Sequence, residues 1–313
     1  MTTEKFHLRR SLLATPGNVR SKVEKARKLP VDILMLDLED GVPAMDSAKA
    51  LARKVLVEAL SCPASFSARE VAIRVNGPRT KWFVEDAAFV AGLNIPTVVV
   101  PMVQDAADVI YVERSLANCG AAASLGLILL IETPASVVNL PQMVEASPRT
   151  NGLIAGGLDY AAGLHSLSIL PIRDPADTKG QDEDLVYMRQ RVLAVGRAYG
   201  LSVLDAMRPG LISDLDSFRA AARRARWLGF DGVDFYHPAF VDIANEVFTP
   251  SPEELSWADR VLQENMSSRD DEPASIKVDG RVVLPQHVEL AHRLKALARE
   301  ISPRNATKAT VSA

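Results

Sequence analysis

Several short aliphatic runs of this 313-residue sequence end in residues that can do acid–base or metal chemistry. The residues at these ends are Asp37, Glu39, Asp40, Arg74, Asn76, Glu132, Asp159, Asp205, Arg208 and His237. If the runs are strands of one parallel barrel, their carboxyl ends meet at one mouth. Carboxylates gathered there repel one another unless a cation or a basic group lies between them. The alternative is that each charge only marks where a buried strand meets water. The convergence of acidic residues favours a shared site.

Glu132 and Asp159 are the predicted metal ligands, because they end neighbouring apolar runs and offer hard carboxylate oxygens. Such a pair suits Mg²⁺, which takes one or two protein carboxylates and leaves positions for water and substrate oxygens. Arg74 offers a fixed, charged fork for a substrate carboxylate or a developing oxyanion. A structural ion pair from Arg74 to Asp37 or Glu39 is the alternative, and both roles can hold together.

The elements that must position these residues alternate between short aliphatic runs and longer amphipathic stretches. The runs cover residues 11–14, 33–38, 71–75, 97–103, 125–131, 152–155, 202–206 and 232–236. Several are almost continuously apolar, as expected for parallel strands covered on both faces. Between them, apolar residues recur at helical spacing, for example in residues 181–199 and 214–228. The alternation predicts an α/β fold, a (β/α)₈ TIM barrel, with a doubly wound open sheet as the competing topology.

The predicted barrel takes up residues 1–250, and residues 251–313 form a C-terminal helical appendage that we expect to contact a neighbouring subunit. Within the appendage we expect a helix over residues 252–264, a polar linker over 266–275 and a second helix over 287–301. Ser251 before Pro252, with acidic residues in the first turn, is typical of a helix start.

The composition excludes several classes of protein. A hydrophobic share of 48% with 24% charged residues is typical of a soluble globular protein. A formal net charge of −3 does not provide the excess of positive charge typical of proteins that bind nucleic acid. The longest aliphatic run, residues 125–131, is far shorter than the roughly 20 residues that span a bilayer. Residues 1–10 are polar, unlike a signal peptide. Cys62 and Cys119 have neither metal-ligand spacing nor a disulfide framework. We expect a cytoplasmic protein with reduced thiols and no nucleic-acid or membrane partner.

The order of short motifs along the chain resembles the HpcH/HpaI aldolase and citrate lyase superfamily, and within it the citrate lyase beta-subunit-like CoA lyases. The motifs include Arg10-Ser11, Thr15-Pro16-Gly17-Asn18, Leu36-Asp37-Leu38-Glu39-Asp40, Arg74-Val75-Asn76, Leu130-Ile131-Glu132-Thr133, Gly156-Gly157-Leu158-Asp159 and His237-Pro238. The resemblance implies a (β/α)₈ barrel that assembles as a homotrimer or homohexamer. It also implies Mg²⁺ held by Glu132 and Asp159, and an acyl-CoA substrate that Arg74 and Glu132 help to bind.

The same resemblance assigns CoA binding to the N-terminal segment. Residues 15–25 correspond to the part of the CoA lyases that contacts CoA, so Arg10, Arg20 and Lys25 are the expected CoA or substrate contacts. For Arg20 and Lys25 the alternative is that they are basic residues solvated on a first helix. Asp40 stands where aldolases of free 2-oxo acids carry a histidine base, which favours the CoA lyase branch.

Departures from the family pattern bear on the reaction. Met102 and Gln104 replace two charged residues after the fourth run, and residues 233–236 replace a stretch that contains lysine. Leu284 stands where many lyases have an aspartate that enters a neighbouring subunit's site, and leucine cannot carry a proton. The candidate proton carriers are then Asp37, Glu39, Asp40 or water.

We therefore predict a Mg²⁺-dependent lyase that breaks a carbon–carbon bond in a carboxylated 3-hydroxyacyl-CoA of the citryl-, malyl- or citramalyl-CoA type, giving a 2-oxo acid and an acyl-CoA. One alternative keeps the site but hydrolyses the thioester. Another is a catalytically degenerate subunit that binds an acyl-CoA or a partner protein. The loss of an acid at Leu284 favours that reading, and the retention of Glu132, Asp159 and Arg74 opposes it.

Overall fold

A computed structural model describes residues 7–61, 66–170, 182–207, 212–267 and 275–301. The chain divides into two compact units, Met1–Asn245 and Glu246–Ala313. The strands of the first unit are β1 (Ser11–Pro16), β2 (Ile33–Asp37), β3 (Glu70–Arg74), β4 (Thr97–Val100), β5 (Gly126–Ile131), β6 (Thr150–Ala155), β7 (Ser202–Ala206) and β8 (Gly232–Phe235).

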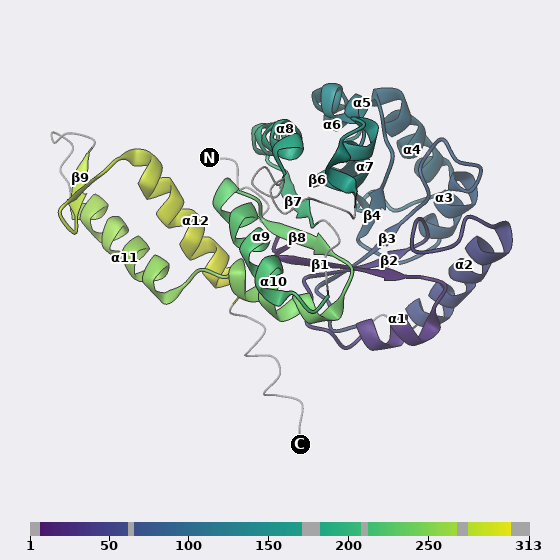
Figure 1. Cartoon of the computed structure of the whole chain (residues 1–313), viewed down its shortest axis with the longest axis horizontal. Helices are drawn as coiled ribbons and strands as arrows, with labels where there is room; N and C mark the ends of the chain where they lie inside the picture. The colour runs from purple at the N-terminus through teal and green to yellow at the C-terminus, as the bar shows by residue number, and fades with distance from the viewer. Residues whose placement is uncertain (1–6, 62–65, 171–181, 208–211, 268–274, 302–313) are drawn as a thin grey trace, which may run out of the picture. The chain divides into compact units, whose positions relative to one another are not determined.

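These strands form a closed parallel barrel. They pair in sequence order, and β8 returns to pair with β1 (Figure 1). The predicted TIM barrel is confirmed, because an open doubly wound sheet would leave two unpaired edges. β4 ends at Val100, before the end predicted from the apolar run. Pro101 has no N–H for the sheet, and Met102 adopts a left-handed φ of 55°.

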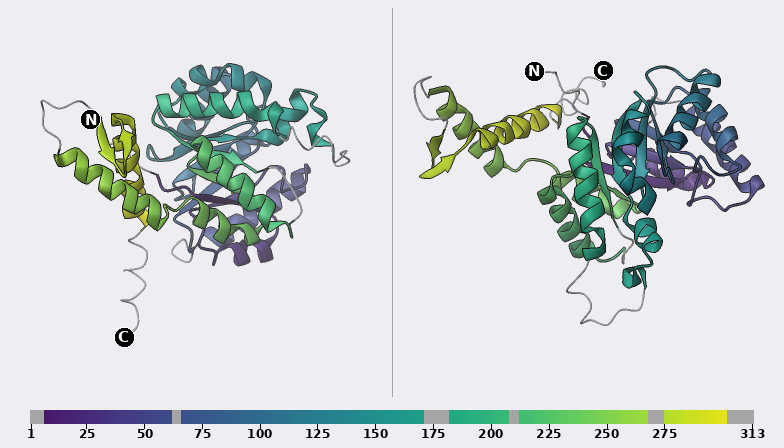
Figure 2. Two further views of the ribbon diagram at one scale, coloured as in Figure 1. Left: turned by 60° about the vertical axis from the view of Figure 1, so that its left-hand side comes forward. Right: turned by 90° about the horizontal axis from the view of Figure 1, so that it is seen from above.

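Helices connect the strands and surround them on the outside in each view (Figures 1 and 2). They are α1 (Arg20–Ala26), α2 (Asp46–Leu60), α3 (Phe83–Ala91), α4 (Ala106–Asn118), α5 (Pro134–Val138), α6 (Leu140–Glu145), α7 (Gly157–Gly163), α8 (Val186–Ala198), α9 (Leu215–Leu228) and α10 (Val241–Val247). Local sequence sets several boundaries. Asp105 caps α4 by accepting from the N–H of Asp108. Gly229 ends α9 with a φ of 111°, which glycine adopts without strain.

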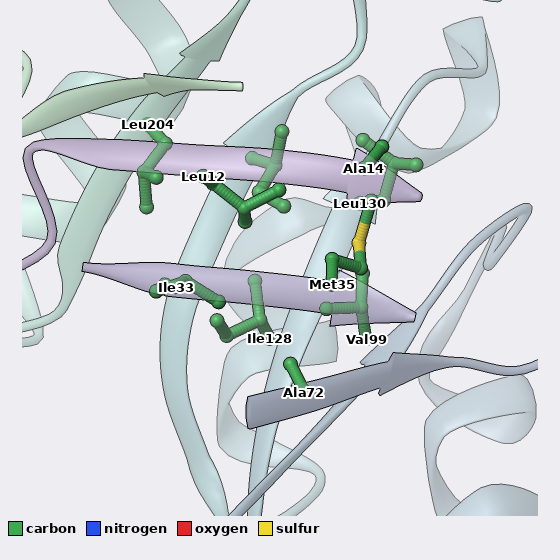
Figure 3. Close-up of a cluster of buried hydrophobic side chains, with 10 residues drawn as sticks. Leu12, Ala14, Ile33, Met35, Ala72, Val99, Ile128, Leu130 and Leu204 are labelled. Atoms are coloured by element: carbon green, nitrogen blue, oxygen red, sulfur yellow. The ribbon is translucent and has the colours of Figure 1, made fainter. Parts of the chain in front are cut away.

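Alternate residues of the strands fill the barrel interior with aliphatic side chains (Figure 3). Side chains two positions apart share a face of a strand, so one residue in the core fixes the direction of the others. The core residues are Leu12, Ala14, Ile33, Met35, Ala72, Val99, Ile128, Leu130, Ile154 and Leu204. The next inward positions of β2 and β3 are Asp37 and Arg74, where the apolar interior gives way to charge.

A buried polar cluster occupies the amino ends of the strands. Arg9, which is almost fully buried, donates from Nε and Nη2 to the carboxylate of Glu70 at 3.0 and 2.9 Å. Its Nη1 donates to Oγ of Ser202 at 2.7 Å, and Nη2 also reaches Oδ1 of Asn151 at 3.1 Å. The charged fork therefore links strands from both halves of the barrel at the end opposite the acidic residues.

The second unit has its own small core. It contains α11 (Pro252–Ser267), the hairpin of β9 (Ile276–Val278) and β10 (Arg281–Val283), and α12 (Pro285–Ile301). The two helices lie side by side (Figure 2). Buried residues of this core are Ala258, Val261, Val278, Val283 and Ala291. The helical appendage predicted at the C-terminus is confirmed. In the described part of the chain, no helix combines the length and apolarity needed to cross a membrane.

Candidate active site

The register between β2 and β3 brings Asp37 and Arg74 together. They are partner positions on adjacent strands, and each lies two residues beyond an inward core residue. Nε of Arg74 donates to Oδ1 of Asp37 at 2.7 Å, and Nη2 donates to Oδ2 at 2.7 Å. Both side chains are buried. The structural ion pair considered for Arg74 is therefore present, in bidentate form.

The remaining guanidinium nitrogen of Arg74 faces two further carboxyl groups. Nη1 lies 3.0 Å from Oε2 of Glu39 and 3.7 Å from Oδ2 of Asp40. Oε2 of Glu39 is buried and has no hydrogen-bond partner within the described residues, so the 3.0 Å contact is an ion pair without hydrogen-bond geometry. Burial raises the pKa of Glu39 to about 8, although the charge of Arg74 opposes the rise. An incoming carboxylate could compete with Glu39 for Nη1.

Glu132 follows β5 and faces inward, two residues beyond the core residue Leu130. The N–H of Met102 donates to its Oε1 at 2.8 Å, and the left-handed backbone of Met102 is part of this arrangement. A Cβ atom at Gly156 would lie 2.5 Å from Cβ of Glu132, so only glycine leaves room for this side chain. Burial, followed by repulsion from Glu39, raises the pKa of Glu132 well above its ordinary value.

Asp159 lies in the first turn of α7, directly after β6. Burial raises its pKa, and repulsion from Asp40 adds to the rise. Glu132 also experiences the charge of Asp159, which places the two carboxyl groups in one neighbourhood. The structure therefore brings together Asp37, Glu39, Asp40, Arg74, Glu132 and Asp159, which lie on β2 and β3, directly after β2 and β5, and on α7.

Glu132 and Asp159 fit a cation that needs few protein ligands. No group of three or more His, Cys, Asp or Glu residues able to hold a metal is found in the ranges that the structure describes. A closed structural zinc site needs four such ligands, whereas Mg²⁺ is held by one or two carboxylates and completes its shell with water and substrate. A divalent cation between Glu132 and Asp159 would also stabilise their charged forms against the burial that raises both pKa values.

Lys49 is a functional neighbour that sequence reasoning missed. It lies on α2, and its buried Nζ donates to the backbone oxygens of Leu38 at 2.6 Å and Glu39 at 2.7 Å. The ammonium also lies 5.1 Å from the ring centroid of Trp82. Lys49 therefore holds the backbone that carries the acidic residues after β2. The available signal was its place on the apolar face of α2, three residues before the buried Ala52.

We expect Lys49→Met to lower the free energy of unfolding by about 2 kcal/mol, because two buried carbonyls lose a charged donor. Lys54→Met, at an exposed position of the same helix, is the matched control and should stay within about 0.5 kcal/mol of the parent. Urea unfolding followed by circular dichroism gives both values. Equal stability of the two variants would contradict the role assigned to Lys49.

The structure does not bring Arg10 to this site. Arg10 precedes β1 and lies at the amino end of the barrel, whereas the acidic residues lie at the carboxyl ends of the strands. Its Nε and Nη2 donate to the buried carboxylate of Asp32 at 2.8 and 3.0 Å. This fixed pairing gives Arg10 a structural role in joining β1 to the start of β2, in place of the expected substrate contact.

Arg20 and Lys25 lie exposed on α1, after the carboxyl end of β1. Arg20 forms an ion pair with Glu58 of α2. Near them, Oδ1 of Asn18 is buried and has no hydrogen-bond partner among the described residues. An unsatisfied buried oxygen is costly, so this segment has capacity for a donor from a ligand.

Other residues collected at strand ends have local partners instead. Asp205 faces outward from β7, where Nε of Arg189 donates to it at 3.1 Å. His237 caps the short 3₁₀ helix Pro238–Phe240 by accepting from the N–H of Ala239 at 3.2 Å. Asn76 donates from Nδ2 to Oδ2 of Asp86 at 2.6 Å. Arg208 lies outside the described residues, as does Cys62.

Asp234 of β8 is a second missed residue. It pairs in register with Leu12 of β1, which lies in the barrel core, so Asp234 also faces inward. The alternation of β8 carried that signal, but Asp234 lies within the apolar run and was not counted as a strand end. Tyr236, two residues later, follows on the same face.

Comparison with known proteins agrees with this geometry. The model of the HpcH/HpaI aldolase/citrate lyase family matches residues 10–238. A (3S)-malyl-CoA thioesterase of Cereibacter sphaeroides (strain ATCC 17025 / ATH 2.4.3) is 32% identical over 296 residues, which cover 95% of this chain and 96% of the relative. The citrate lyase subunit beta of Escherichia coli (strain K12) is 28% identical over 284 residues, 89% of each chain.

Solved structures include a similar protein with ligands. The crystal structure of protein CitE from Mycobacterium tuberculosis in complex with magnesium, acetoacetate and coenzyme A superposes with a TM-score of 0.74 and 27% sequence identity. The match covers 92% of this chain and 97% of the CitE chain. The likeness therefore extends over nearly the full length of both proteins.

Proposed function

We propose that this chain, which belongs to the HpcH/HpaI aldolase/citrate lyase family, is a Mg²⁺-dependent lyase that cleaves a carbon–carbon bond of a carboxylated 3-hydroxyacyl-CoA. The products would be a 2-oxo acid and a shorter acyl-CoA. The observation that carries the proposal is the pair formed by the buried Glu132 and the more exposed Asp159, beside the Arg74 cluster at the mouth of the barrel. Citrate lyase subunit beta and malyl-CoA lyase relatives support the lyase class.

Glu132 and Asp159 would hold the Mg²⁺, which supplies Lewis-acid polarisation of substrate oxygens when it is bound. The N–H of Met102 keeps Glu132 in place through Oε1, and Gly156 leaves the space that the side chain needs. The CitE structure from M. tuberculosis contains magnesium, which supports this choice of ion.

Arg74 would bind the substrate carboxylate through Nη1, the corner of the guanidinium that faces Glu39 and Asp40. Asp37 fixes the plane of that guanidinium through its bidentate pairing. Backbone N–H groups of Glu39 and Gly41 donate to Asp37 at 2.8 Å each and fix the carboxylate in turn. Asp37 is thereby a positioning residue, and Glu39 and Asp40 are the acidic groups that face the substrate space.

The CoA part of the substrate would lie along α1. Arg20 and Lys25 supply exposed positive charge for its phosphates, and Asn18 supplies the unsatisfied oxygen described above. Coenzyme A in the M. tuberculosis CitE structure supports a CoA ester as the substrate class. Assembly as a homotrimer or homohexamer, and a cytoplasmic location, remain proposals from the sequence.

A product assay tests the lyase reaction. The protein is incubated with Mg²⁺ and with malyl-, citramalyl- or citryl-CoA in separate reactions, and the 2-oxo acid and the free thiol are measured independently. The expected result is a 2-oxo acid from at least one ester without matching release of thiol. Absence of a 2-oxo acid from all three esters would contradict the proposal.

Thioester hydrolysis on the same site is the second candidate, and the 32% identity with a (3S)-malyl-CoA thioesterase favours it. In that reaction a carboxylate such as Glu39 or Asp40 would take a proton from water as the water attacks the thioester. Free thiol would then appear in equal amount with malate or citramalate. The assay above distinguishes the two reactions because only hydrolysis releases the thiol without a 2-oxo acid.

Leu284 bears on the alternative of a catalytically degenerate subunit. It is 44% exposed and lies between β10 and α12. Its backbone oxygen accepts from the N–H of His287 at 2.9 Å, and its own N–H donates to Nδ1 of His287 at 3.1 Å. Leu284 therefore stands at the position that caps α12, where its side chain satisfies no backbone donor.

We expect Leu284→Asp to stabilise the protein by about 1 kcal/mol, because aspartate caps a helix start and leucine does not. Thermal unfolding measures this gain. If the chain is a competent lyase, kcat/KM should rise by less than about tenfold, or 1.4 kcal/mol of transition-state binding. The same change in an Asp159→Ala background is the control. Strong activation that depends on Asp159 would overturn our preference for a competent lyase and support the degenerate-subunit reading.

A further inference from the structure

β8 and the residue that follows it carry two inward polar residues, Asp234 and Tyr236, that the proposed function leaves without a role. Asp234 pairs in register with Leu12 of β1 and with Ala206 of β7, and Leu12 belongs to the barrel core. Asp234 therefore faces into the barrel, one layer below the mouth. Tyr236 lies two positions further along, on the same face, where the strand opens into the mouth.

Among the described residues, Asp234 is buried without an ion-pair partner. It is 3% exposed, and its Oδ1 has no hydrogen-bond partner in the described part of the protein. Arg74 attracts it and Asp37 repels it. Arg74, however, is already bound in bidentate form by Asp37. A buried carboxyl group without a partner lowers the free energy of unfolding. Its presence here therefore suggests that it acts on a ligand or on a neighbouring group.

Tyr236 directly follows the carboxyl end of β8, at the mouth of the barrel where the acidic cluster also lies. The charges that act on its phenol are those of Asp234, Arg74, Glu132 and Asp37, which lie on, or directly after, four different strands around the mouth. The residue is 53% exposed, so substrate and water can reach the ring. Repulsion from Asp234, followed by burial, raises the pKa of the phenol above its ordinary value. A phenol with its ordinary pKa is already protonated at neutral pH, and this rise moves its ionisation to still higher pH.

The proposed reaction needs a group of this kind. Cleavage of the carbon–carbon bond leaves a thioester enolate that must gain a proton at carbon. Carboxylates that hold a cation are ionised and have no proton to give. Burial raises the pKa of Glu39 to about 8, so Glu39 can carry a proton, but it pairs with Arg74. A neutral phenol has a proton to give. The phenolate that it leaves is a far weaker base than a thioester enolate, so the proton transfer is favourable.

We propose that Tyr236 is the proton donor to the thioester enolate, and that Asp234 beneath it is the positioning residue that maintains the phenol as a donor. This inference rests on the proposed lyase function. The O–H bond of Tyr236 breaks as a C–H bond forms on the acyl-CoA product. The resulting phenolate regains a proton from solvent at its exposed side, which balances the proton that the substrate hydroxyl loses during bond cleavage.

Tyr236→Phe tests the donor because it removes only the hydroxyl group. We expect kcat to fall roughly a hundredfold, the usual contribution of a positioned acid, while KM and the Kd for Mg²⁺ change by less than about threefold. Water then protonates the enolate, so the solvent deuterium isotope effect on kcat should become larger than in the parent. A purely structural role would not change that isotope effect. Tyr187→Phe is the matched control, since Tyr187 is 58% exposed on α8, and its kinetics should equal those of the parent.

Asp234→Asn tests the positioning residue by a measurement that needs no turnover. The phenolate absorbance of Tyr236, obtained as the difference between each protein and its Tyr236→Phe counterpart, is followed as pH rises. In Asp234→Asn the phenol should ionise at lower pH than in the parent. An unchanged titration would overturn the role of Asp234.

The outcomes separate the two proposals. A parent enzyme that forms a 2-oxo acid, with Tyr236→Phe equally active and its isotope effect unchanged, would overturn the donor role and leave the lyase function standing. A parent enzyme that forms no 2-oxo acid would overturn the lyase function and, with it, a donor to an enolate.

Discussion

Replacing Arg74 should produce two different losses, according to the substituent. Arg74→Met leaves Asp37 and Glu39 buried without their cation, and uncompensated buried charge of this kind costs about 3 to 5 kcal/mol of unfolding free energy. Activity should fall roughly a hundredfold to a thousandfold, as when a donor to a developing oxyanion is removed. Urea unfolding and steady-state kinetics measure the two effects.

Arg74→Lys keeps the charge and separates geometry from charge. A compact ammonium cannot reproduce the two parallel bonds to Asp37 and at the same time present a third nitrogen to the substrate. We expect kcat/KM to fall roughly tenfold or more, about 1.4 kcal/mol of transition-state binding. Arg79→Lys is the control, at a half-exposed arginine that pairs with the buried Asp108 outside the Arg74 cluster, and its kcat/KM should match that of the parent. Normal kinetics in Arg74→Lys would reduce Arg74 to a structural ion pair.

Glu132→Gln and Asp159→Asn should each lower kcat/KM by roughly a thousandfold, about 4 kcal/mol, at fixed Mg²⁺ concentration. Each substitution keeps the shape of the side chain and removes a hard anionic ligand. It also removes a source of repulsion within the acidic cluster, so the metal-free variants should be at least as stable as the parent. Loss of activity together with retained or increased stability separates a functional ligand from a structural residue.

The control is Glu145→Gln, at a carboxylate that bonds to Tyr199 on the outside of the barrel. Its activity should match that of the parent. A parent-like kcat/KM in both Glu132→Gln and Asp159→Asn would contradict the assignment of the site.

Much of this site could be predicted because it follows from strand order. Asp37, Arg74 and Glu132 each end an apolar run, and a closed parallel barrel brings such ends to one mouth. Ending a strand is not sufficient, because side chains alternate between the inner and outer faces of a strand. Asp205 also ends a strand, but Leu204 and Ala206 occupy the inward face, so Asp205 points outward to Arg189.

The remaining features depend on tertiary packing that one sequence does not specify. The position of Lys49 depends on how α2 docks beside the loop after β2, which its amphipathic pattern does not determine. Arg10 precedes its strand, and the expectation of a substrate contact came from motif resemblance rather than from strand polarity. The left-handed φ of Met102 directs its N–H toward Glu132. No glycine or asparagine at this position of the sequence predicts that φ.

Calorimetric titration with Mg²⁺ tests most directly the claim that Glu132 and Asp159 form a metal site. The measurement needs no substrate and is independent of which CoA ester is used. The parent protein, first freed of metal by a chelator, should bind one Mg²⁺ ion per chain, and Glu132→Ala and Asp159→Ala should each lose the signal. Unchanged Mg²⁺ binding in both variants would contradict the account.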